Sequence, residues 1–305
     1  MTDPDVVHKV VAAGRERFGA DYRSAYLWGS HARGDAIETS DIDMGVFVRG
    51  RVPEAERLRA ENEIDEAMGE QQLDFAVVGD DTLTGRDAVT FRFGARRIDG
   101  EDLSEIVPLP SREEWMDFAD EAALHWVTRK RPRPFAPDVA PLRADDEFLG
   151  YVDRTITIRG RETPMTKTPL GIAGRIATAN VARASGRFVG DRPQAIQAYG
   201  EDVGGALAGY LVELQECLRT RWRYLVPTSA ADRATLGRLC RQTLEFEREF
   251  IGRVAADPRG PRTDRLWTKI ASGRPRFMKS RTTVGPVDNY DQGSEHGWPI
   301  KLIGL

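Results

Sequence analysis

Hydrophobic and polar positions in the first hundred residues follow two periods, one typical of helices and one of strands. Residues 5–18 carry valines and a phenylalanine at helical spacing among charged residues, which predicts an amphipathic helix. The charged segment 53–68 predicts a second helix, with Pro53 near its first turn. Short apolar runs predict strands at 24–28, 41–48 and 72–78. The order helix, strand, turn, strand, helix, strand predicts a small α/β sheet.

Beyond residue 110 the pattern becomes helical. Ser111 and Glu114 have the spacing of a capping box, which predicts a helix that begins there. Residues 151–160 fit either a strand or a ligand-facing loop. Further helices are predicted near 166–185, 192–199, 202–224 and 229–255. After residue 257 the chain is rich in Gly, Pro and polar residues, which predicts an irregular tail that packs on the body.

The predicted fold class is therefore α/β, with three parts. A small mixed-sheet domain covers 1–110, an all-α helical bundle domain covers 111–256, and the irregular tail covers 257–305. The length of 305 residues suits two domains of ordinary size.

Composition narrows the class of protein. Hydrophobic residues make up 40% and charged residues 30% of the chain, as in soluble globular proteins. No apolar run approaches the roughly 20 residues of a membrane helix. The acidic start does not have the basic segment followed by an apolar segment that is typical of a secretory signal. Cys217 and Cys240 both fall in helical patterns, which argues against a disulfide scaffold. We expect a cytoplasmic protein with no membrane partner.

The net charge of −4 conceals an asymmetry along the chain. Residues 1–110 carry 13 Lys and Arg against 23 Asp and Glu, a net charge of −10, whereas the remainder has a net charge of +6. An acidic first part suggests a metal site, and a basic second part suggests an anionic molecule nearby.

Three aspartates carry the candidate metal chemistry. Asp41 and Asp43 are two residues apart on a predicted strand, so their carboxylates share one face. Two negative charges at such short range repel each other, which favours a cation between them. Hard oxygen ligands select Mg²⁺. Asp74 lies on the next predicted strand and is the candidate third carboxylate. Three such carboxylates can hold two metal ions about 3.5–4 Å apart, an arrangement found in enzymes that catalyse in-line displacement at phosphorus.

The turn before this acidic strand supplies candidate phosphate ligands. Gly29 allows close approach of the backbone to a ligand, and Ser30 offers a hydroxyl and an N–H group at the start of a short helix. Arg33 either donates to a phosphate or forms a salt bridge with Asp35 or Glu38. Turn and acids together predict a site for a nucleoside triphosphate and metal.

These residues form a longer motif, which resembles the signature of the DNA polymerase β-like nucleotidyltransferase superfamily. It reads Gly29-Ser30-x-Ala32-Arg33-Gly34-x5-Ser40-Asp41-Ile42-Asp43, and with Asp74 the resemblance spans residues 23–78. It implies that Gly29 and Ser30 hold the triphosphate, and we also expect Arg33 and Ser40 of the same motif to bind the nucleotide. It further implies catalytic metal binding by Asp41, Asp43 and Asp74.

The rest of the chain is similar, more loosely, to aminoglycoside nucleotidyltransferases, which add a helical substrate domain to this catalytic domain. By that resemblance Lys167 opens a helix that faces the cleft and contacts a phosphate. One departure is Ala95, which stands where the streptomycin/spectinomycin branch has the glutamate that serves as general base. The basic second part is also a poor host for a polycationic aminoglycoside.

The sequence therefore predicts an enzyme that moves a nucleoside monophosphate, by default AMP from ATP, to a hydroxyl group of a small molecule and releases pyrophosphate. The acceptor would be an antibiotic or a sugar-containing metabolite, and two Mg²⁺ ions are expected. The general base is either Asp74 or one of Glu114, Asp117 and Glu121.

Two other functions stay open. One is transfer to a macromolecule, either a tRNA 3′ end or a protein hydroxyl, although no RNA-binding module is visible and contact of the basic segment 129–134 with nucleic acid is not favoured. The other is a non-catalytic nucleotide-binding or antitoxin-like partner. His31 is interpreted as a local turn residue, and Trp115, Trp126 and Trp222 as core residues. Monomer and dimer are both compatible with the sequence.

Overall fold

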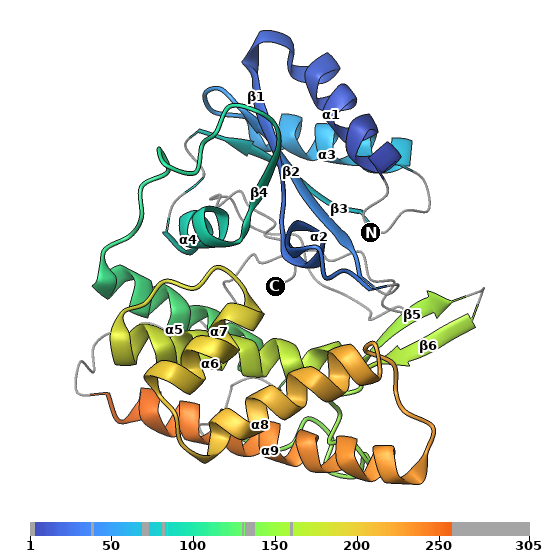
Figure 1. Ribbon diagram of the computed structural model, residues 1–305, viewed down its shortest axis with the longest axis vertical. Helices are drawn as coiled ribbons and strands as arrows, with labels where there is room; N and C mark the ends of the chain where they lie inside the picture. The colour runs from blue at the N-terminus through green and yellow to red at the C-terminus, as the bar shows by residue number, and fades with distance from the viewer. Residues whose placement is uncertain are drawn as a thin grey trace. The chain divides into compact units, whose positions relative to one another are not determined.

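The computed structural model describes residues 4–37, 40–68, 73–80, 83, 85–129, 131, 138–158 and 161–257 (Figure 1). The described residues divide between Pro110 and Ser111 into two compact units. The predicted tail, apart from Asp257, lies outside the described residues.

A four-stranded mixed sheet forms the centre of the first unit. Its strands are β1 (Tyr22–Leu27), β2 (Ile42–Val48), β3 (Leu73–Gly79) and β4 (Arg96–Gly100), in the order β3-β2-β1-β4. β1 is antiparallel to both β2 and β4, whereas β2 and β3 are parallel. The predicted mixed sheet is confirmed.

Helices cover both faces of this sheet (Figure 1). α1 (Pro4–Phe18) and α3 (Glu54–Met68) pack on one face, against alternate residues of β1 and β2 such as Leu27 and Met44. α4 (Gly85–Gly94) packs on the other face with Tyr26, Trp28 and Phe47. Because side chains alternate along a strand, the odd-numbered residues of β2 and the even-numbered residues of β3 belong to the α4 face.

α4, β4 and the short 3-10 helix η1 (Gly19–Asp21) were not predicted from the sequence. α4 starts and ends with glycine and is only 10 residues long. β4 is a five-residue edge strand with little apolar character. It is fixed in part by Asp99, which accepts hydrogen bonds from the Tyr22 hydroxyl at 2.6 Å and from Arg15 Nη2 at 2.8 Å.

The second unit is largely helical. It contains α5 (Arg112–Thr128), α6 (Lys167–Ser185), α7 (Arg192–Asp202), α8 (Ala206–Gln215), the π-helical segment η2 (Glu216–Arg221) and α9 (Ala230–Ala255). β5 (Arg154–Ile158) and β6 (Arg161–Met165) form an antiparallel hairpin. The strand alternative for 151–160 is therefore the observed one, and the unit is not entirely α.

The predicted ends of the helices in this unit match in most cases. Ser111 accepts a hydrogen bond from Glu114 N, and Glu114 accepts one from Ser111 N, so the capping box is present. The helix predicted near 202–224 is observed as continuous helical structure from Ala206 to Arg221, but α8 gives way to the π-helical η2 and the chain turns at Trp222. Trp115 and Trp222 are buried, as the core interpretation requires, whereas Trp126 is half-buried.

Among the helices of the described residues, none has the length and apolar character needed to cross a membrane.

Gly45 in β2 makes room for Trp28, which leads into the turn at Gly29. A Cβ atom at Gly45 would lie 2.5 Å from Trp28 Cη2 and 3.3 Å from the carbonyl oxygen of Ala76. We expect Gly45→Ala to lower the free energy of unfolding by about 1–3 kcal/mol, the cost of overpacking a core. Denaturant titration of the variant and the wild type measures this loss.

Gly209→Ala is the matched control. A Cβ atom there meets nothing within 4 Å, on an exposed position of α8. We expect this variant to gain up to about 1 kcal/mol from helix propensity. Equal stability of Gly45→Ala and the wild type would contradict the packing described for Trp28.

Candidate active site

The turn after β1 brings a glycine against a buried carboxylate. The backbone of Trp28 is extended, and its backbone N–H donates a hydrogen bond to the carbonyl oxygen of Asp43 at 2.9 Å. Gly29 follows with φ +59°, in the left-handed region, and begins the short helix α2 (Gly29–Arg33). A Cβ atom at Gly29 would overlap Asp43 Oδ2. Glycine is therefore needed here both for its backbone angle and for the space that Asp43 occupies.

The register of the sheet places Asp43 and Asp74 beside each other. Their Cα atoms are partners across the parallel strands β2 and β3, and neighbouring strands lie about 4.8 Å apart. Asp43 is 3% exposed, whereas Asp41 and Asp74 are half-buried. Asp41 precedes Asp43 by two residues, at the point where β2 begins. Asp43 and Asp74 belong to the α4 face of the sheet by strand alternation, whereas Asp41 lies just before β2.

The carboxylates are near one another in the sheet, but their side chains are not arranged as ligands of one metal ion. Within the described residues, no group of three or more His, Cys, Asp or Glu side chains is arranged to hold a metal ion. Adjacent carboxylates repel, and a cation between them would offset that repulsion. The residue types and the register fit a divalent cation, provided that the side chains turn toward a common point.

His31 helps to fix the loop that leads to the aspartates. It lies on α2, is 7% exposed, and forms a hydrogen bond with the backbone of Ser40. Burial is the main cause that lowers the pKa of His31, while Ser40 and Asp41 act in the opposite direction. The interpretation of His31 as a local turn residue agrees with this position. Its support of the segment before Asp41 was missed, because nothing in the sequence pairs residue 31 with residue 40.

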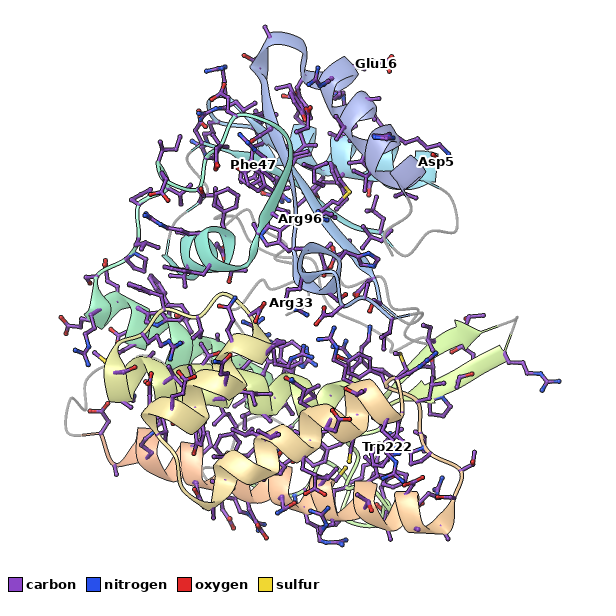
Figure 2. The ribbon with its side chains drawn as sticks, viewed as in Figure 1. Asp5, Glu16, Arg33, Phe47, Arg96 and Trp222 are labelled. Carbon is purple, nitrogen blue, oxygen red and sulfur yellow. The ribbon has the colours of Figure 1, made fainter. Side chains whose placement is uncertain are left out.

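The predicted phosphate ligands occupy defined places in the same turn. Ser40 Oγ accepts a hydrogen bond from Ile37 N at 3.0 Å, so Ser40 shapes the loop. The carbonyl oxygen of Ser30 accepts from Asp35 N at 3.0 Å. Arg33 Nε lies 3.3 Å from Asp35 Oδ2, which is one of the two salt bridges considered from the sequence. Figure 2 labels Arg33 on α2 and Arg96 on β4, whose Nη2 donates to the carbonyl oxygen of His31 at 3.4 Å.

Two further candidates belong to the second unit. Lys167 begins α6, and its Nζ lies 5.5 Å from the centre of the Tyr224 ring. Glu114 is engaged in the capping box, and the hydrogen bonds from Ser111 lower the pKa of its carboxyl group. A carboxylate with a lowered pKa is a weaker base, so Glu114 is poorly suited to remove a proton.

Residues 19–89 match the family described as Polymerase beta, Nucleotidyltransferase. The match includes the Gly29 turn and all three aspartates. It confirms the resemblance seen in the sequence and supports nucleotidyltransferase activity for the first unit.

Two solved structures are similar in part. One is spectinomycin adenyltransferase AAD(9) from Enterococcus faecialis with ATP and spectinomycin, with 12% identity, coverage of 81% of this chain and 99% of that chain, and a TM-score of 0.48. The other is a toxin-antitoxin with AMP-PNP, with 16% identity, coverage of 39% of this chain and 90% of that chain, and a TM-score of 0.29. No curated protein matches the chain.

The overlap between a side chain at residue 29 and Asp43 can be measured with two glycine variants. Gly29 and Gly34 both have positive φ, but a Cβ atom at Gly34 meets nothing within 4 Å. We expect Gly34→Ala to lose about 1–2 kcal/mol of unfolding free energy through its backbone angle. Gly29→Ala should lose clearly more, because it also displaces the Asp43 carboxylate. Equal losses in denaturant titration would show that the carboxylate does not lie against Gly29.

Proposed function

We propose that the protein transfers a nucleoside monophosphate, AMP from ATP, to a hydroxyl group of a small molecule and releases pyrophosphate. The observation that carries this proposal is the contact between the Gly29 turn and Asp43, with Asp74 beside Asp43 on the next strand. A nucleotidyl transfer needs a place for a triphosphate next to carboxylates that bind a cation. The turn and the strand ends offer both within a few residues.

Asp41, Asp43 and Asp74 are the residues that would hold a divalent cation, and Mg²⁺ suits their oxygen ligands. Such an ion, or a pair of ions, would neutralise charge on the triphosphate. The backbone at Gly29 and the hydroxyl groups of Ser30 and Ser40 would position the phosphates, with Arg33 as a further donor.

The chemical step exchanges one bond to phosphorus for another. The acceptor oxygen forms a bond to the α-phosphorus, the bond from that phosphorus to the oxygen that bridges to the β-phosphorus breaks, and pyrophosphate leaves. The proton of the acceptor hydroxyl passes to a carboxylate. Asp74 is the base that we propose, because Glu114 is held in its helix cap and Ala95 has no ionisable group. Asp117 and Glu121 on α5 are the alternatives.

Removal of one carboxylate charge tests the proposed site. We expect Asp41→Asn and Asp43→Asn to reduce pyrophosphate release from ATP at least about 100-fold, a loss of the size seen when one electrostatic contact to a transition state is removed. The fold should persist, because Asn keeps the shape of Asp. A coupled phosphate assay with pyrophosphatase measures turnover, and circular dichroism measures the fold.

Asp99→Asn is the matched control. Asp99 pairs with Ala25 of β1 in the sheet, and its carboxylate contacts Arg15 and Tyr22 rather than the Gly29 turn. Its pKa is lowered by the hydrogen bonds from Tyr22 and Arg15, against the effect of burial. We expect this variant to turn over at nearly the wild-type rate. Full turnover by Asp43→Asn would contradict the proposed role of the aspartates.

A further inference from the structure

A buried ion pair joins α3 to the strand that carries Asp74. Arg57 and Glu61 lie one turn apart on α3 and are 6% and 5% exposed. Arg57 Nη1 donates a hydrogen bond to Glu61 Oε1 at 2.9 Å. The same oxygen accepts a hydrogen bond from the backbone N–H of Val77 on β3 at 3.1 Å. One carboxylate therefore links a helix, a buried guanidinium group and a strand.

The strand that Glu61 contacts stands at the edge of the described four-stranded sheet, where β2 is its one neighbour. Val77 is 1% exposed. A backbone N–H that is buried away from water needs an acceptor, and an edge strand has no second neighbouring strand to supply one. Glu61 supplies that acceptor from α3. At this point β3 is therefore held on both sides, by the parallel ladder with β2 and by Glu61.

The ion pair is a costly way to stabilise α3. Two buried charges lose their hydration, and apolar residues of similar volume in their place are often neutral or stabilising. In the part of the chain that the structure describes, Arg57 Nε and Glu61 Oε2 are buried and have no hydrogen-bond partner, so the lost hydration is only partly offset. Ala60 and Ile64 beside the pair belong to the apolar core. What distinguishes Glu61 from an apolar residue here is its bond to β3.

Glu61 meets β3 close to Asp74. Val77 follows Asp74 by three residues, which is about 10 Å of extended chain. A second contact holds the far end of the strand, where the N–H of Asp80 donates to the carbonyl oxygen of Gly50 at 3.0 Å and Asp80 Oδ2 accepts from Gly50 N at 3.0 Å. Asp80 is six residues from Asp74. The contact with Glu61 is therefore the nearer of the two to the candidate metal site.

We propose that Glu61 is a positioning residue for the metal site, because its bond to Val77 fixes β3 and so sets the place of Asp74 beside Asp43. This inference rests on the proposed function, in which both aspartates bind a divalent cation. Mg²⁺ demands near-ideal octahedral geometry of its oxygen ligands, so a displaced carboxylate loses metal affinity. Arg57 holds the Glu61 carboxylate toward the strand. Glu61 acts through β3 and is not itself a ligand.

The experiment measures how much Mg²⁺ the full-length protein needs to bind ATP, by calorimetry at a series of Mg²⁺ concentrations. The methionine variant, Arg57→Met with Glu61→Met, removes both charges and the acceptor for Val77. The glutamine variant, Arg57→Met with Glu61→Gln, removes both charges but keeps an acceptor oxygen. We expect the methionine variant to need about fivefold more Mg²⁺ for half-maximal binding, which corresponds to the loss of one hydrogen bond. The glutamine variant should need as much as the wild type.

Amide hydrogen exchange of Val77, followed by NMR without nucleotide or metal, reports the bond itself. Val77 should exchange slowly in the wild type and in the glutamine variant, and faster in the methionine variant. Exchange at the wild-type rate in the methionine variant would contradict the bond. If the methionine variant fails to fold, Glu61→Asp gives both tests, because it keeps a charge for Arg57 but withdraws the carboxylate from Val77 by one methylene group.

Asp80→Ala is the matched control on the same strand. It removes the side-chain contact with Gly50, at the end of β3 that is farther from Asp74. We expect it to lower the free energy of unfolding in denaturant titration and to leave the Mg²⁺ requirement unchanged. If Asp80→Ala needs as much additional Mg²⁺ as the methionine variant, any weakening of β3 has this effect, and the positioning role of Glu61 is overturned.

The outcomes for the wild type and the variants separate this inference from the proposed function. If the wild type binds ATP in a Mg²⁺-dependent manner and the methionine variant has the same Mg²⁺ requirement, the positioning role is overturned and the proposed function stands. If the wild type shows no Mg²⁺-dependent binding of ATP, the proposed function is contradicted, and the positioning role with it. An increased Mg²⁺ requirement that the glutamine variant does not reverse also overturns the positioning role, because the bond to Val77 is then not its cause.

Discussion

The contact between Gly29 and the Asp43 carboxylate is the constraint on which the candidate site depends. Residue 29 needs a left-handed backbone angle, and it also lies where a side chain would displace Asp43. The backbone N–H of Trp28 donates a hydrogen bond to the carbonyl oxygen of Asp43. The glycine turn and the acidic strand are therefore in direct contact through both the backbone and the side chain of Asp43.

The pairing of strands in the sheet places Asp74 beside Asp43. Parallel pairing of β2 with β3 aligns Asp43 with Asp74, and strand alternation places Ile42, Met44, Val46 and Val48 of β2 on the opposite face. A cation would offset the repulsion between the acids, which is the physical reason for the metal site that we propose.

Strong local signals in the sequence predicted much of this. The periodic pattern gave β1, β2, β3 and the main helices, because each buries a regular apolar face, and the capping box at Ser111 marked the start of α5. β4 and α4 were missed because a charged edge strand and a short helix between glycines have weak patterns. The support of the Ser40 segment by His31 was also missed, because spacing along the chain does not reveal a contact between residues 31 and 40.

The most direct test of the central claim is calorimetry of the full-length protein with ATP, GTP, CTP and UTP, each with and without Mg²⁺. The account predicts that ATP binds only when Mg²⁺ is present, and that Asp43→Asn abolishes this binding while Asp99→Asn retains it. Binding of ATP with equal affinity by Asp43→Asn, or no binding of any of the four nucleotides with Mg²⁺, would contradict a nucleotide and metal site at the Gly29 turn.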